Sequence, residues 1–255
     1  MAWGNVIAEG PAYVVLGRGR WATRLRGILA PEHRHVTRIE ETRRASGESD
    51  VAYKSRLAEA MSASGARIAW LAVLPGPHIP LMMEAALDAG LHVVVEKPWQ
   101  GSQFLTKMLA AKAKSLHCLI TIHFECCLLE EVERWHGEIH PGTGLRFGAR
   151  FFLNRPDHKG ISAMDNLGSH LLAICAYVVP KSAIQEIRRG YEQQDERCVW
   201  PEKRKTRTAF IDLLANKEPI IQRFIAKVES SLEGEGFPLG FEFAMLVAKE
   251  AKTIS

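Results

Sequence analysis

The stretch that decides the fold is residues 12–22, AYVVLGRGRWA. A short apolar run ending at Leu16 meets Gly17, and a stretch of helical character follows as far as Ala30, where Pro31 closes it. An apolar run, a glycine turn and a helical pattern in this order are typical of a β-strand that leads directly into an α-helix. The segment therefore predicts a βα unit.

The same alternation continues over the next hundred residues. We expect strands at 35–40, 68–74, 92–98 and 117–123, and helices at 53–62, 78–89 and 102–115. The run IAWLAVL at 68–74 is apolar throughout, as strands covered on both faces are. Strands that alternate with helices predict right-handed crossovers and a parallel sheet with helices on both faces. Residues 1–122 are thus expected to form a doubly wound α/β domain of the Rossmann type.

Beyond residue 122 the rhythm changes, and residues 123–255 are expected to form a second domain. We expect a helix at 128–135, a strand at 145–153, and helices at 166–178 and 239–254.

The composition excludes several classes of protein. Hydrophobic residues make up 47% of the chain and charged residues 24%, as in soluble globular proteins. The longest apolar runs are far shorter than the roughly 18–20 residues of a membrane-spanning helix, so we expect no membrane partner. The first ten residues, MAWGNVIAEG, lack the features of a signal peptide, which favours a cytoplasmic location.

Charge and cysteine content exclude two further kinds of site. The net charge of +4 is mild, and the arginines at 18, 20, 24 and 26 have the spacing of a solvated helix face, so we expect no nucleic-acid partner. The five cysteines form no paired framework. Cys126 and Cys127 have no thiol or histidine at the spacings of zinc sites, so we interpret them as ordinary buried thiols and expect no metal.

Residues 17–22 form a G-x-G-x-x-A pattern between the first strand and the first helix. Gly17 permits a tight turn, Gly19 lets the backbone approach a pyrophosphate, and the small Ala22 lets helix and strand pack closely. With the intervening Arg20 and Trp21, they are the predicted pyrophosphate-binding residues.

The end of the second strand concerns the choice between NAD and NADP. Glu40 or Glu41 has about the right separation to bind the adenosine ribose. Arg43 and Arg44 follow at once, and an arginine there can hold the additional phosphate of NADP. Both cofactors stay open, with NADP slightly favoured.

Residues 90–98, GLHVVVEKP, are the most specific feature of the sequence. A Glu-Lys-Pro at the carboxyl end of a buried strand brings an amine to the ligand crevice of an open α/β sheet. Together with the glycine turn, the break at 75–78 and the sequence NLGSH at 166–170, it resembles the glucose–fructose oxidoreductase (Gfo/Idh/MocA) family. The resemblance covers about residues 12–125 and is thinner afterwards.

This resemblance implies a nicotinamide dinucleotide in the first domain and a substrate pocket beside a second, α+β domain with an open, mainly antiparallel sheet. Residues 123–255 are few for such a domain, which would bind substrate and mediate oligomerisation. Lys97 matches the family's catalytic lysine, whose ammonium can donate a proton to a carbonyl oxygen as hydride arrives. The further residues expected to contact the cofactor are Leu74, Pro75, His78 and Glu96.

His170 matches the histidine on the first helix of the family's second domain, which takes or supplies the proton of the reacting hydroxyl. Four positions earlier the family commonly carries an aspartate, where this chain has Asn166, with Asp165 displaced by one residue. An amide can orient a substrate but cannot exchange protons. His123 and Asp165 are candidate substrate contacts. Where sugar-oxidising relatives often have a segment that contains arginine or tyrosine, this chain has Glu125 and Cys126.

The leading hypothesis is an NAD(P)-dependent oxidoreductase that moves hydride to or from a small polar substrate, either a sugar-like alcohol or ketone or an imine. Lys97 would donate the proton, His170 would assist and Asn166 would orient. The alternative is a dinucleotide-binding sensor or accessory protein with little or no turnover, which Asn166 and the short second domain motivate. We expect a homo-oligomer, most simply a dimer.

Overall fold

The computed structural model divides the chain into two compact units, which are described separately. The first comprises residues 1–96 and 100–121, and the second comprises residues 97–99 and 122–255. The described residues are 10–32, 35–138, 144–150, 169–178, 191–192, 197–198, 206–212, 218–233, 237, 239–241, 243 and 247. The chain changes unit at Ile122, next to the expected boundary, while the function expected for each domain stays a prediction.

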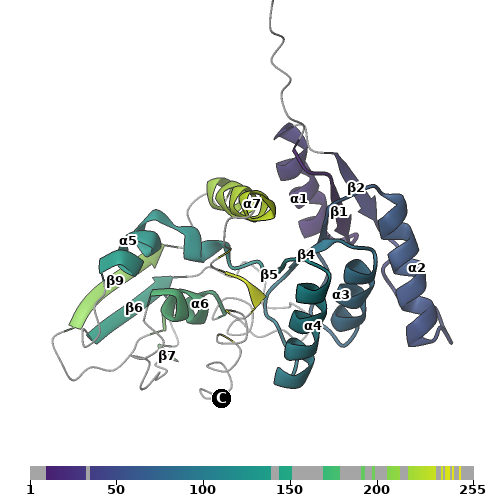
Figure 1. The fold of residues 1–255 in the computed structure, drawn as a ribbon. Coiled ribbons are helices and arrows are strands. Elements are labelled where there is room, and N and C mark those ends of the chain that lie inside the picture. The colour runs from purple at the N-terminus through teal and green to yellow at the C-terminus, as the bar shows by residue number, and fades with distance from the viewer. Residues whose placement is uncertain are drawn as a thin grey trace, which may run out of the picture. The chain divides into compact units, whose positions relative to one another are not determined.

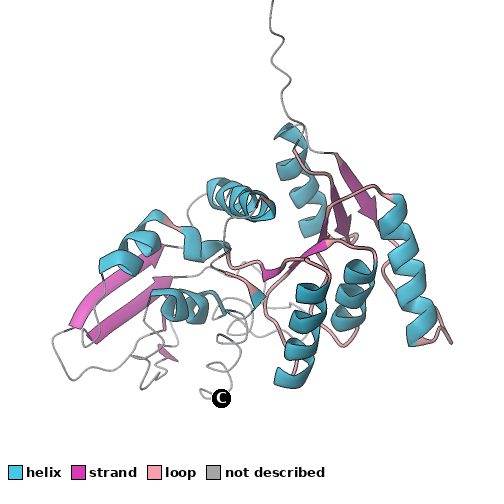
Figure 2. Ribbon diagram, viewed as in Figure 1, coloured by secondary structure: helices cyan, strands magenta, loops and turns pink. Residues whose placement is uncertain are grey.

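The first unit is built on a five-stranded sheet with the strand order β2-β1-β3-β4-β5. The strands are β1 (Tyr13–Leu16), β2 (Val36–Ile39), β3 (Ile68–Leu71), β4 (His92–Val95) and β5 (Ile120–Ile122). The pairs β1–β2, β1–β3 and β3–β4 are parallel, with Tyr13 opposite both Val36 and Ile68. Every side chain of β1 and β3 is buried, as the continuous apolar runs predict. The predicted Rossmann sheet is confirmed (Figure 2).

Helices cover both faces of this sheet. They are α1 (Arg20–Leu29), α2 (Asp50–Ala63), α3 (Ile79–Asp88) and α4 (Gln103–Ser115), with a 3₁₀ turn, η1, at Ala30–Glu32. α1 connects β1 to β2, toward one edge of the sheet, whereas α2, α3 and α4 connect strands that follow one another toward the β5 edge. Since each crossover is right-handed, α1 lies on one face of the sheet and α2 to α4 lie on the other. In agreement, α3 packs against both α2 and α4 (Figure 1).

Two of these helices start where serines cap them. The side chain of Ser49 accepts a hydrogen bond from the Ala52 amide at 3.1 Å, and Ser102 accepts one from Leu105 at 3.2 Å. The last strand starts later than predicted because His117 has φ 53°, a left-handed conformation that cannot continue an extended strand.

The second unit contains helices around two short strand pairs. Its elements are η2 (Glu125–Leu128), α5 (Glu130–Glu138), β6 (Gly144–Arg150), α6 (Ser169–Val178), β7 (Tyr191–Glu192), β8 (Arg197–Cys198), β9 (Thr206–Asp212) and α7 (Glu218–Leu232). β6 pairs with β9 in parallel, and β7 pairs with β8 antiparallel. The predicted open, mainly antiparallel sheet is not confirmed, since the longer of these described pairs is parallel.

α7 and β9 were not predicted from the sequence. α7 buries Ile221, Phe224, Ile225 and Val228, which lie on one helical face, and it packs against η2. Of the helix predicted at 239–254, Phe241, Phe243 and Val247 are described as helical, and most other positions lie outside the described residues. No helix in the described part of the chain has both the length and the apolar character to cross a membrane.

Candidate functional site

The glycine turn lies where the strand order reverses, between β1 and β3. Gly17 follows β1 with φ +135°, a conformation that L residues rarely adopt. A Cβ added to Gly17 would lie only 2.5 Å from the carbonyl oxygen of Ala72, which follows β3. The Ala72 amide in turn donates to the Leu16 carbonyl at 2.9 Å. Only glycine fits this turn, and parallel sheets bind their ligands at such a switch point.

Gly19 is the N-cap of α1, and it differs from Gly17. Its backbone is extended, with φ −73° and ψ 169°, and a Cβ added there would meet nothing within 4 Å. The fold itself therefore does not require glycine at this position. The first turn of α1 also contains no acidic side chain. Open space in front of a helix N-terminus suits a bound anion, because the first amide groups of a helix lack acceptors within it.

The carboxylate of Glu96 ties the Glu-Lys-Pro segment to this turn. Its Oε1 atom accepts hydrogen bonds from the indole of Trp21 in α1, at 2.6 Å, and from the indole of Trp70 in β3, at 2.9 Å. Two residues predicted to bind the cofactor, Trp21 and Glu96, thus contact each other. Lys97 is the next residue and is half-buried; its catalytic role stays a prediction.

The loop after β3 carries three more of the predicted cofactor contacts. Leu74 is exposed, whereas Pro75 and His78 are half-buried. Burial lowers the pKa of His78 below its ordinary value, so its imidazole is neutral at neutral pH. His78 directly precedes α3 and its ring lies against Gly76, where an added Cβ would be 2.8 Å from the ring carbon Cε1.

The segment after β2 contains the predicted ribose and phosphate contacts. Glu41 and Arg43 are exposed. Arg44 is engaged, because its guanidinium lies 2.7 Å from the carboxylate of Asp50 and donates to the Glu48 carbonyl at 2.6 Å. Arg43 is the other arginine predicted to favour NADP. Its side chain is exposed, and the described contacts of the loop include no ion pair of Arg43.

Arg56 holds the same loop together from α2. It donates to both carboxylate oxygens of Glu48, at 2.8 and 3.0 Å, and to the carbonyls of Glu41 and Arg43 at 3.1 and 2.9 Å. The hydrogen bond from Arg56 and one from the Ala45 amide lower the pKa of Glu48 to about 2. The loop that would receive the ribose is thus shaped by a charged pair.

In the second unit, Glu125 lies between two histidines. One carboxylate oxygen is 3.6 Å from Nε2 of His123, and the other is 3.7 Å from Nε2 of His170. All three side chains are buried, with exposed fractions of 5% for Glu125, 2% for His123 and 1% for His170. His123 also packs edge-on against Phe224 of α7, with ring centroids 4.8 Å apart.

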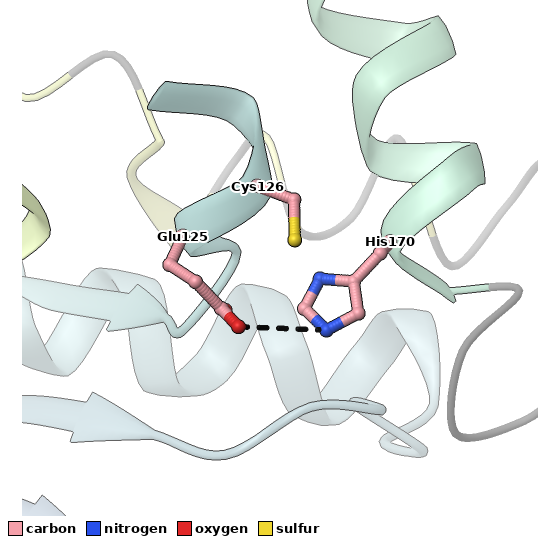
Figure 3. A group of neighbouring side chains, drawn as sticks. All are labelled: Glu125, Cys126 and His170. Carbon is pink, nitrogen blue, oxygen red and sulfur yellow. Dashed lines mark ion pairs between the residues drawn. The ribbon is translucent and has the colours of Figure 1, made fainter. Parts of the chain in front are cut away.

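Cys126 joins this group, as Figure 3 shows. The ligand atoms of Glu125, Cys126 and His170 all lie within 4.8 Å of one another. Burial, together with the neighbouring Cys126, Glu125 and Cys175, raises the pKa of the adjacent Cys127 thiol well above its ordinary value. The cysteine next to the cluster is therefore a protonated thiol at neutral pH.

Two predicted site residues, Asn166 and Asp165, lie outside the described residues. Conversely, sequence reasoning assigned Glu125 no role, and Cys126 was interpreted as an ordinary buried thiol. The signal was present, since a glutamate and a cysteine follow closely after the predicted strand end at His123, with Phe124 between. What was missing was the position of α6, which brings His170 to them.

Comparisons with known proteins support the fold. No family model and no curated protein matches the sequence. Among solved structures, the UDP-N-acetylglucosamine 3-dehydrogenase GnnA from Acidithiobacillus ferrooxidans superposes with a TM-score of 0.68 at 13% identity, covering 96% of both chains. The WlbA (WbpB) dehydrogenase from Thermus thermophilus, in complex with NAD and alpha-ketoglutarate, gives 0.60 at 14% identity over 93% of this chain and 92% of that one.

A third similar structure is larger than this chain. An inositol dehydrogenase homolog from Azotobacter vinelandii, complexed with NADH and myo-inositol, gives a TM-score of 0.53 at 17% identity. The match covers 68% of this chain but 54% of the other, so the chain spans about half of that relative's length. The chain has the fold of these dehydrogenases, in agreement with the fold that the resemblance implies for the first domain.

Proposed function

We propose that the protein is an NAD(P)-dependent oxidoreductase that transfers hydride to or from a small polar substrate, a sugar-like alcohol or ketone or an imine. The observation that carries this proposal is the contact between Glu96 and Trp21. It holds Glu96, the residue that precedes Lys97, at the first turn of α1, beside the glycine turn at the switch point of the sheet. The similar structures solved with NAD or NADH support the same cofactor class.

The reaction would need one hydride and one proton. A bound reduced nicotinamide would supply the hydride, and in the direction of reduction the ammonium of Lys97 would donate a proton to the carbonyl oxygen of the substrate. His170 would exchange the proton of the reacting hydroxyl, and Asn166 would orient the substrate. His123 and Asp165 would contact it.

We favour NADP over NAD because of the segment after β2. Arg43 is exposed there, and a guanidinium is well suited to hold the additional phosphate of NADP. Arg44 would contribute less, because Asp50 and the Glu48 carbonyl engage it.

A second candidate function is a sensor that binds dinucleotide without turnover. It is favoured by the burial of His170, which is 1% exposed and lies beside the Glu125 carboxylate. A side chain so deeply buried presents little surface to a substrate.

The test compares wild type with Lys97→Ala and, as a matched control, with Lys107→Ala, which removes an exposed lysine of α4. Lys97→Ala should keep its affinity for the dinucleotide and lose about 10²- to 10⁴-fold in turnover on a panel of sugars, polyols, ketones and imines. The control should behave as wild type. Normal turnover in Lys97→Ala would refute the catalytic role, and dinucleotide binding with no turnover in wild type would favour the sensor.

A further inference from the structure

Three buried side chains of the second unit each present one atom that can bind a metal ion. The atoms are a carboxylate oxygen of Glu125, the sulfur of Cys126 and a ring nitrogen of His170, all within 4.8 Å of one another. Figure 3 shows the three side chains pointing toward one another, the first two from η2 and the third from α6. Carboxylate, thiolate and imidazole are the ligand types that proteins use to bind Zn²⁺.

The separation of Glu125 and His170 matches a metal site better than a direct hydrogen bond. Oε1 of Glu125 lies 3.7 Å from Nε2 of His170, whereas N–H···O hydrogen bonds span about 2.7–3.2 Å. An oxygen and a nitrogen ligand of one tetrahedral ion, each about 2.0–2.2 Å from it, are about 3.3–3.5 Å apart, and pairs that include a sulfur at about 2.3 Å are about 3.5–3.7 Å apart. The ligand atoms of the three side chains lie at most 4.8 Å apart, and movements of about 1 Å would bring them to the separations of a metal site.

Burial adds an electrostatic reason. Glu125 is 5% exposed and Cys126 is 1% exposed, so a cation held between them would lie in surroundings of low dielectric constant, where its attraction to a carboxylate is stronger than in water. A divalent cation among these ligands would compensate a carboxylate and a thiolate together. The ligands also come from two elements that pack against each other, η2 and α6.

We propose that Glu125, Cys126 and His170 form a three-ligand site for a divalent transition-metal ion, with Zn²⁺ as the preferred ion. His123 would not be a ligand. Its Nε2 lies 3.6 Å from the second oxygen of Glu125, and a shift of about 0.5 Å would bring the two atoms to hydrogen-bond distance, where His123 would orient the carboxylate as outer-shell partners of metal ligands do. Three protein ligands leave one tetrahedral position for water or for an oxygen of a bound polar molecule. The proposal does not depend on dinucleotide binding. With a metal bound, His170 would be a ligand instead of the proton-exchanging residue, because a metal-bound imidazole nitrogen cannot accept a proton, and His123 would face the ligand instead of the substrate.

The first experiment uses the wild-type chain alone. The protein is stripped with a chelator, loaded with Co²⁺ as a spectroscopic substitute for Zn²⁺, and titrated with Zn²⁺. We expect one ion per chain after dialysis, a thiolate-to-cobalt charge-transfer band, and loss of that band as Zn²⁺ displaces Co²⁺. A chain that retains no stoichiometric metal, or a cobalt complex without the thiolate band, would show that the proposal is wrong. This measurement needs no variant that must fold.

The variants then locate the site. Cys126→Ser should abolish the thiolate band, while Cys127→Ser, which removes a buried thiol one residue away, should keep both the band and the stoichiometry. His123→Gln should weaken Zn²⁺ binding about 10- to 100-fold, the effect typical of losing an outer-shell partner. Circular dichroism establishes that each variant is folded. An unchanged band in Cys126→Ser, or its loss in Cys127→Ser, would overturn the assignment.

A further variant separates this proposal from the proposed function. Gly19→Val alters the expected pyrophosphate site in the first unit and should bind Zn²⁺ as wild type does. Failure of dinucleotide binding with intact Zn²⁺ binding would leave the metal site standing, and the reverse result would leave only the oxidoreductase proposal.

Discussion

The two glycines of the turn should respond to substitution in opposite ways, which tests the dinucleotide site. We consider Gly17→Ala and Gly19→Val, with Gly27→Ala as a matched control on the exposed side of α1. Gly17 is required by the fold, whereas Gly19 is required only if a ligand approaches it. The first variant should therefore lose stability and the second should lose binding.

The expected loss of stability for Gly17→Ala follows from its surroundings. The new Cβ would lie 2.5 Å from the Ala72 carbonyl oxygen, at φ +135°. A non-glycine residue in a sparsely populated backbone region costs about 1–3 kcal/mol, and overpacking costs a similar amount. We expect the free energy of unfolding to fall by about 2–6 kcal/mol, a large part of the 5–15 kcal/mol typical of a domain.

Gly19→Val should leave the fold almost unchanged. Its φ of −73° is allowed for any residue, and a Cβ meets nothing within 4 Å, so only the weaker cap preference of valine remains, about 1 kcal/mol or less. A bound pyrophosphate, however, would be displaced from the first amides of α1. Losing two charge-assisted hydrogen bonds of about 1.5–3 kcal/mol each corresponds to a 100-fold or greater loss of affinity.

The assay combines thermal unfolding with titration of tryptophan fluorescence by NADPH and NADH. Trp21 lies in the first turn of α1, so a ligand there should quench emission. Gly27→Ala should bind as wild type and gain a few tenths of a kcal/mol to about 1 kcal/mol in stability. Wild-type affinity in Gly19→Val would refute the pyrophosphate assignment, and wild-type stability in Gly17→Ala would refute the argument from the Ala72 contact.

Three more predictions concern charge. Replacing Arg43 and Arg44 together by Ala should weaken NADPH binding at least about tenfold more than NADH binding, and equal losses would contradict the preference for NADP. The pKa of Glu48 is lowered from 4.5 to about 2, so its ion pair with Arg56 stabilises the fold above about pH 4.5, and this contribution is lost as the pH falls toward 2. The stability of Glu48→Gln should therefore fall less than that of wild type between these two pH values. Identical profiles of stability against pH for the two proteins would count against the pair. Asn166→Asp should raise the pKa of His170 and shift the pH profile of turnover or reduce the rate, whereas activity found only in this variant would favour the sensor.

The sequence alone predicted the order of strands and helices in the first unit, though not all of their bounds. Its strands are short apolar runs, its helices follow glycine or serine signals, and its turn has the pattern of residues 17–22. Each signal acts within a few residues, because propensity, capping and positive φ are local properties. The residue that leaves no room for a side chain at Gly17 could not be predicted in this way, because only the folded sheet shows that the Ala72 carbonyl lies next to Gly17.

The second unit was decided by tertiary structure. α7 has its apolar residues at Ile221, Phe224 and Val228, a spacing that sequence reasoning could have detected as a helix but not as the cover over His123. The pairing of β6 with β9 joins segments separated by α6, and no local signal specifies such a partner.

The same reason applies to the candidate metal site. The sequence placed Glu125 and Cys126 side by side and showed no ligand at a zinc spacing near them. His170 reaches them because α6 packs against η2. Spacing rules describe ligands that one turn or loop brings together, whereas a site shared by two packed helices depends on burial of apolar faces, whose partners are chosen only when the whole core forms.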